Sequence, residues 1–140
     1  MNLGIATNEG ELELYLMSSP TLNTFSKESV NIFIDEGYSV IGTQKIKVST
    51  LNKIIDDYLG GCFPNFISLD TEGSELNILK SIDYEKSYPQ VICVETISFS
   101  EKGRGVKDIK IIEFLTDKGY MVFADTYINT IFVRKIDWIR

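Results

Sequence analysis

The chain of 140 residues contains no histidine, and this absence excludes several kinds of chemistry. Without an imidazole there is no Ser-His-Asp triad, no Cys-His pair, no histidine zinc ligand and no histidine general base. The two cysteines, Cys62 and Cys93, lack the spacing of a metal or redox motif, and we predict that both are free and structural. Acid–base chemistry must therefore come from carboxylates, tyrosines or lysines.

Positive charge and long apolar runs are also scarce. Lysine and arginine number 14 against 20 acidic residues, which gives a net charge of -6 and no attraction for nucleic acid or anionic lipid. No apolar run reaches the length that spans a bilayer, and the first residues lack the basic start and apolar core of a signal peptide. We therefore expect a cytoplasmic protein whose partners include neither nucleic acid nor a membrane.

The hydrophobic content of 44% is enough for one real core, and we expect residues 1–140 to form a single domain. Alternation of polar and apolar residues predicts an antiparallel strand over 11–16. Residues 26–36 fit a strand or a helix, and we favour a helix that Ser26 caps and Gly37 ends. The remaining pattern predicts, in order, strand 44–48, helix 51–59, strand 65–69, helix 74–82, strand 91–94, loop 98–105, a helix from Val106 that Gly119 ends, and two antiparallel strands, 120–124 and 130–134.

The most informative stretch is 68–75, where a strand that we predict to be buried on both faces turns into a helix. Ligands of open α/β sheets bind outside the carboxyl ends of the strands, so Asp70 and Glu72 should project toward a crevice. The next predicted strand leads into Glu95 in the same way. Alternatively, Glu72 and Glu75 only complement the positive end of the helix dipole, an explanation that fits Asp70 less well.

The acidic turn belongs to a longer pattern that covers nearly the whole chain. Its parts are, in order, 10–15, 21–28, Thr50-Leu51, the run from Phe66 to Glu75, Leu79-Lys80, Val94-Glu95, Gly119-Tyr120 and 129–133. Together they resemble the FkbM-type methyltransferase domain. The resemblance implies an α/β fold: a partial Rossmann-like class I methyltransferase sheet with parallel central strands, an antiparallel last strand, flanking helices and an N-terminal antiparallel strand extension.

The resemblance also implies a function and a set of site residues. Such proteins use S-adenosylmethionine and usually methylate a hydroxyl of a sugar, polyketide or related small molecule, so the expected partner is a small-molecule or glycan acceptor. Asp70 would be the catalytic base, Glu72 would orient the acceptor or the turn, and Glu95 would be a second polar contact. Asp70 and Thr71 would also bind the cofactor. No metal ligand is expected.

One part of the family pattern is missing. No Gly-x-Gly turn precedes a helix, and no second strand ending in an acid for the ribose is found. We interpret Leu3-Gly4-Ile5-Ala6 as a remnant of the family's third strand, and expect an N-terminally truncated domain that alone binds the cofactor poorly. An open sheet edge would then favour a homo-oligomer or a complementing N-terminal half.

Two other functions stay open on the sequence. Asp70, Glu72 and Glu95 could form an oxygen-rich site for magnesium or calcium in a hydrolase or phosphotransferase. The acidic turn could instead only cap a helix in a non-catalytic interaction module whose exposed sheet edge recruits a partner.

Overall fold

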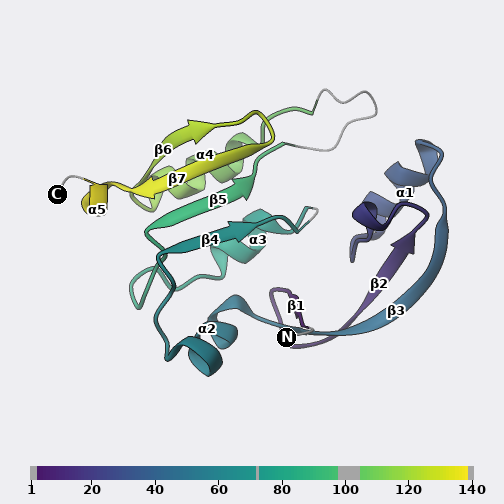
Figure 1. Ribbon diagram of the computed structural model, residues 1–140, viewed down its shortest axis with the longest axis horizontal. Helices are drawn as coiled ribbons and strands as arrows, with labels where there is room; N and C mark the ends of the chain where they lie inside the picture. Colours follow the sequence, from purple (N-terminus) through teal and green to yellow (C-terminus); the bar gives the residue numbers. More distant parts are fainter. Residues whose placement is uncertain (1–2, 72, 98–104, 139–140) are drawn as a thin grey trace.

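A computed structural model describes residues 3–71, 73–97 and 105–138, and within these ranges the strands form two sheets (Figure 1). The smaller sheet has the order β1-β3-β2 and the larger one the order β4-β5-β7-β6. The elements are β1 (Gly4–Ile5), β2 (Gly10–Met17), a short 3-10 helix (Pro20–Leu22), α1 (Lys27–Asp35), β3 (Val40–Ser49), α2 (Leu51–Leu59), β4 (Phe66–Leu69), α3 (Glu75–Lys80), β5 (Val91–Glu95), α4 (Ile109–Asp117), β6 (Tyr120–Asp125), β7 (Asn129–Arg134) and α5 (Lys135–Trp138).

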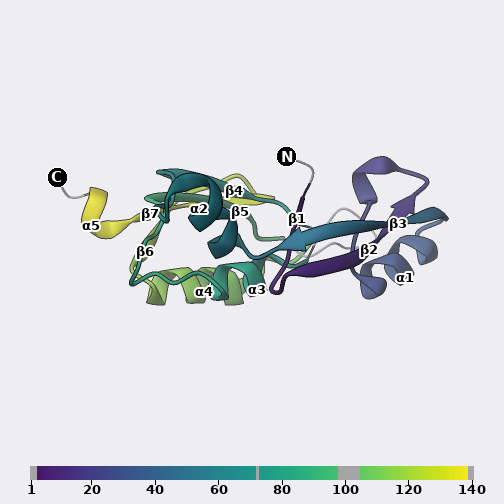
Figure 2. The same cartoon turned by 90° about the horizontal axis from the view of Figure 1, so that it is seen from below.

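The larger sheet holds the main core. β4 and β5 are parallel, whereas β7 runs antiparallel to both β5 and β6, which confirms the predicted α/β fold class with an antiparallel end. α3 and α4 lie together on one face of this sheet (Figure 2). Between the helices and the strands, apolar side chains such as Ile78, Ile92 and Leu115 are fully buried. Burial of each such side chain stabilises the fold by roughly 1.5–3 kcal/mol.

The smaller sheet carries α1 and a second, smaller core. β2 and β3 form an antiparallel ribbon, and α1 packs Val30 and Phe33 against Met17 of β2. The prediction of a helix over 26–36 is confirmed, because the Ser26 hydroxyl accepts the backbone N–H of Ser29 at the helix start. β3 is longer than the predicted strand 44–48, since it pairs with β2 along nearly its whole length. Gly4–Ile5 pairs with β3 and so belongs to this sheet.

The structure corrects three details of the sequence analysis. β4 is not buried on both faces, because it is an edge strand and the side chain of Phe66 is 55% exposed. α4 begins at Ile109 rather than near Val106, because the Asp108 carboxylate caps it by accepting the N–H of Lys110. α3 ends at Lys80, before the predicted limit of 82. Most of the predicted loop, residues 98–104, lies outside the described residues.

The two cysteines and the lengths of the helices bear on the earlier expectations about disulfides and membrane spans. Cys62 and Cys93 are both free, as predicted, and Cys62 is exposed. Among the described residues, no helix combines the length and the apolar character that a membrane crossing requires.

Two tyrosines in the main core link its stability to alkaline pH. The Tyr120 hydroxyl donates a hydrogen bond of 2.6 Å to the carbonyl of Pro89, and the Tyr84 hydroxyl donates one of 3.1 Å to the carbonyl of Leu79. Burial raises the pKa of Tyr120 to about 12 and also raises the pKa of Tyr84. The folded protein therefore keeps these protons at a pH where the unfolded chain, with a tyrosine pKa near 10, loses them.

We predict that this difference destabilises the protein at high pH. Since a raised pKa in the folded state means more bound protons, the stabilisation is complete below about pH 10 and is lost as the pH rises toward about 12. Tyr120→Phe should make this loss shallower, while lowering the free energy of unfolding at neutral pH by about 1–2 kcal/mol because the Pro89 carbonyl loses its donor. Urea unfolding over a pH series measures both effects.

Tyr58→Phe is the matched control, because Tyr58 is 64% exposed. Its pH dependence should equal that of the wild type. If the free energy of unfolding of Tyr120→Phe fell with alkaline pH as steeply as that of the wild type, Tyr120 would not be a cause of the alkaline destabilisation.

Candidate functional site

The turn between β4 and α3 is held by a side chain from the helix. Glu75 is the first residue of α3, is only 6% exposed, and folds its carboxylate back over the turn. This carboxylate accepts hydrogen bonds from the N–H of Thr71 at 2.7 Å, the hydroxyl of Thr71 at 3.0 Å and the N–H of Gly73 at 3.0 Å. Gly73 has φ 103°, a conformation that glycine adopts without strain. Glu75 therefore fixes the shape of the turn.

Three carboxylates meet at this turn. One oxygen from each of Asp70, Glu75 and Glu95 lies within 4.8 Å of the other two. Asp70 is exposed, whereas Glu95, at the carboxyl end of β5, is half-buried. The structure thus brings the predicted residues Asp70 and Glu95 together, while Glu72 lies outside the described residues. Because like charges repel at this range, the cluster is a favourable place for a cation.

Glu75, the third member of this cluster, was not predicted from the sequence as a site residue. Its position in the first helical turn suggested only the dipole effect. An acid directly after a glycine turn, with a threonine four residues before it, was the available signal, because such an acid can reach back to the N–H groups of the turn.

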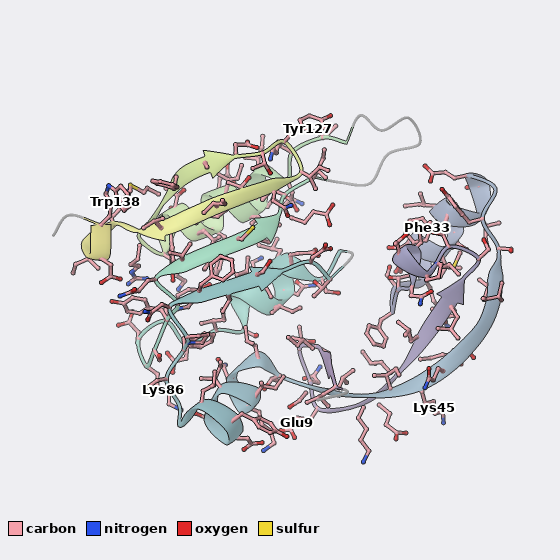
Figure 3. All side chains as sticks on the ribbon, in the orientation of Figure 1. Glu9, Phe33, Lys45, Lys86, Tyr127 and Trp138 are labelled. Atoms are coloured by element: carbon pink, nitrogen blue, oxygen red, sulfur yellow. The ribbon has the colours of Figure 1, made fainter. Side chains whose placement is uncertain are left out.

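Within the part of the chain that the structure describes, two cavities border this cluster. The larger one has a volume of about 480 Å³ and lies between α1, the acidic turn, the end of β5 and the beginning of α4. Glu75 and Glu95 line it together with Phe33 of α1, which Figure 3 shows across from the ends of the larger sheet's strands. The sequence did not show that α1 lines this cavity, because the position of α1 is set by its packing on the ribbon of β2 and β3.

The smaller cavity is lined by other residues of the same turn. It has a volume of about 200 Å³ and its lining includes Asp70, Thr71, Asn23 and Thr24. The side-chain oxygen of Asn23 accepts the backbone N–H of Met17, the last residue of β2, and the Thr24 hydroxyl accepts the backbone N–H of Ser26. Asp70 thus borders the smaller cavity and Glu95 the larger one, so the carboxylate cluster contributes residues to both cavities.

A polar network joins the end of β5 to the segment before α4. The ammonium of Lys107 lies 2.7 Å from the Asp125 carboxylate and donates to the hydroxyls of Thr96 and Thr130 at 2.9 Å and 3.2 Å. Thr96 and Thr130 are fully buried, and their hydroxyls are 2.6 Å apart. The hydrogen bond from Lys107 lowers the pKa of Asp125, which favours the charged pair. Since Thr96 follows Glu95 directly, the network fixes the strand end that carries Glu95.

The comparisons with known proteins give one finding. A family model described as "Methyltransferase FkbM domain" matches residues 1–122, a range that contains Asp70, Glu75 and Glu95. Comparisons with curated proteins and with solved structures give no match. The resemblance noted from the sequence is thereby confirmed.

We predict that Glu75 is a structural part of the turn. Glu75→Ala should lower the free energy of unfolding by about 2 kcal/mol, because the donors on Thr71 and Gly73 lose their acceptor. Glu75→Gln, which keeps one acceptor oxygen, should cost less. Chemical denaturation at neutral pH measures the difference. Glu113→Ala, at an exposed position on α4, is the control and should change stability by less than about 0.5 kcal/mol. Equal losses of unfolding free energy in Glu75→Ala and Glu113→Ala would show that Glu75 does not stabilise the turn.

Proposed function

The chain belongs to the FkbM methyltransferase family, and we propose that it transfers a methyl group from S-adenosylmethionine to a hydroxyl of a small-molecule or glycan acceptor. The observation that carries this proposal is the meeting of Asp70, Glu75 and Glu95, which line two cavities. The cluster lies at the carboxyl ends of two parallel strands, β4 and β5, which is where open α/β sheets bind ligands.

The residues of the site fit the charge of this cofactor. S-adenosylmethionine carries a sulfonium and an ammonium group, and clustered carboxylates stabilise nearby positive charge. Asp70 and Thr71, which line the smaller cavity, would hold the methionine end. The Thr71 hydroxyl donates to Glu75, and its oxygen stays available as an acceptor for the ammonium group. Because the sequence has no Gly-x-Gly turn before a helix, we propose that this chain alone binds weakly and that a second chain could complete the site.

The proposed mechanism gives each cavity one substrate. When bound, the cofactor supplies a methyl group that its sulfonium already activates. Asp70, which lines the smaller cavity, would accept the proton of the acceptor hydroxyl. Glu95 orients the acceptor from the larger cavity. By the family resemblance, Glu72 would orient the acceptor or the turn. Positioning of the reacting atoms is the main contribution of the protein.

We predict that Asp70→Asn lowers the rate of methyl transfer by about 10²–10⁴-fold, because the amide cannot accept the proton. The measurement follows label from methyl-labelled S-adenosylmethionine into a panel of hydroxylated small molecules and glycans. Asp117→Asn, at an exposed position on α4, is the control and should keep the wild-type rate.

Cofactor binding is measured separately by isothermal titration of the same variants. Transfer that survives Asp70→Asn would exclude Asp70 as the base. The absence of both transfer and binding, even at high protein concentration, would count against the proposed function.

A divalent-cation site is the second candidate, and the 4.8 Å grouping of three carboxylates favours it. The hydrogen bonds from Thr71 and Gly73 to Glu75 leave fewer oxygen lone pairs for an ion, so we rank it below methyl transfer. If it is correct, millimolar MgCl₂ or CaCl₂ should raise the melting temperature, and Asp70→Ala should abolish that rise. A melting temperature that neither ion changes would exclude this candidate.

A further inference from the structure

The larger cavity is lined by both charged and apolar side chains. Glu75 and Glu95 supply carboxylates at the turn, and the rest of its described lining consists of apolar residues, of Ser29 and Gly73, and of three charged residues near the start of α4, Lys107, Asp108 and Lys110. The apolar lining residues are Ile32, Phe33, Leu76, Ile97, Val106 and Ile111. The volume of about 480 Å³ is within the range of about 300–1,000 Å³ that is usual for small-molecule sites. A ligand in this cavity would therefore meet both carboxylates and hydrocarbon surface.

The apolar lining includes two side chains that remain exposed to solvent. Ile32 of α1 is 41% exposed, and Val106, just before α4, is 71% exposed. By contrast, Phe33 and Ile111 line the same cavity but are only 1% and 3% exposed, since they also belong to the packed interior. Exposed apolar surface at a cavity gains free energy when a ligand covers it with apolar groups. Ile32 and Val106 are thus the surfaces that an apolar group of a ligand would cover.

The charges along the cavity disfavour an anionic ligand. Among its described lining residues, Glu75, Glu95 and Asp108 are acids, against Lys107 and Lys110. The ammonium of Lys107 is already bound by the Asp125 carboxylate and two threonine hydroxyls, so mainly its aliphatic stem is left to line the cavity. A phosphate or carboxylate on the ligand would therefore experience a net negative surrounding.

Resting on the proposed function, we infer that the methyl acceptor is an uncharged alcohol carried on an apolar body, such as an apolar glycoside, rather than a free sugar or a phosphorylated sugar. Its hydroxyl lies at the carboxylate cluster, and its apolar body lies against Ile32 and Val106. Ile32 is then a specificity-determining residue, which acts on binding of the acceptor and takes no part in the proton transfer.

The experiment uses binding probes and requires no cofactor. Octyl β-D-glucoside below its micelle concentration, methyl β-D-glucoside and octyl phosphate are titrated into the full chain, and affinities are obtained by ligand-observed NMR. We expect octyl glucoside to bind at least about tenfold more tightly than either other probe. Ile32→Ser should weaken octyl glucoside roughly five- to tenfold and leave methyl glucoside unchanged.

Ile34→Ser is the matched control. Ile34 lies on the same helix, is 49% exposed and is not among the residues that line the cavity. Two residues along a helix are about 200° apart around its axis, so Ile32 and Ile34 occupy different faces. The control variant should bind octyl glucoside with wild-type affinity. Equal weakening by both substitutions would overturn the inference.

Three other results would also overturn it. They are equal affinity for octyl and methyl glucoside, equal affinity for octyl phosphate and octyl glucoside, and a change of oligomeric state in Ile32→Ser alone, which would mean that a second copy covers this surface. Label transfer measured in parallel separates the two proposals. Selective binding of octyl glucoside without transfer would show that the cavity takes an alcohol on an apolar body and would count against methyl transfer. Transfer to free sugars as fast as to octyl glucoside would support methyl transfer and count against the inferred acceptor.

Discussion

The hydrogen bonds that Glu75 accepts from the turn before it are the constraint on which the site depends. A carboxylate from the first residue of α3 binds the N–H groups of Thr71 and Gly73, and this fixes where the chain leaves β4. The same contact places a buried charge beside Asp70 and Glu95. The backbone donors that hold Glu75 offset part of the cost of burying its charge. A cationic ligand at the cluster would offset the repulsion among the three carboxylates.

The walls of the site come from segments that are far apart in the sequence. The Lys107 network ties the start of α4 to β5 and β7 through two buried threonines, so one wall is part of the main core. The opposite wall is α1, which packs on β2 in the smaller core. The larger cavity therefore lies between two separately packed bodies of structure. The turn and the end of β5 contribute carboxylates to its lining, and α1 contributes the apolar side chains of Ile32 and Phe33.

Local patterns predicted most of the elements. The helix over 26–36 followed from its cap and its apolar spacing. Asp70 and Glu95 were each expected at the carboxyl end of a strand, but only the structure shows that they converge. Burial of β4 was predicted wrongly, because an apolar run does not show whether its strand lies at the centre or the edge of a sheet. The Lys107 network was not foreseen either, since residues 96, 107, 125 and 130 share no periodic pattern.

The sequence by itself determined the chemistry that is available. It has no histidine, it ends two strands in acids, and it carries the pattern of the FkbM family, because these properties depend on residue types and their local order. Only the tertiary structure decided that Glu75 joins the cluster, that Asp70 and Glu95 border different cavities, and that α1 supplies an apolar wall. The physical reason is that burial and charge proximity arise from contacts between distant segments, and the local sequence does not encode those contacts.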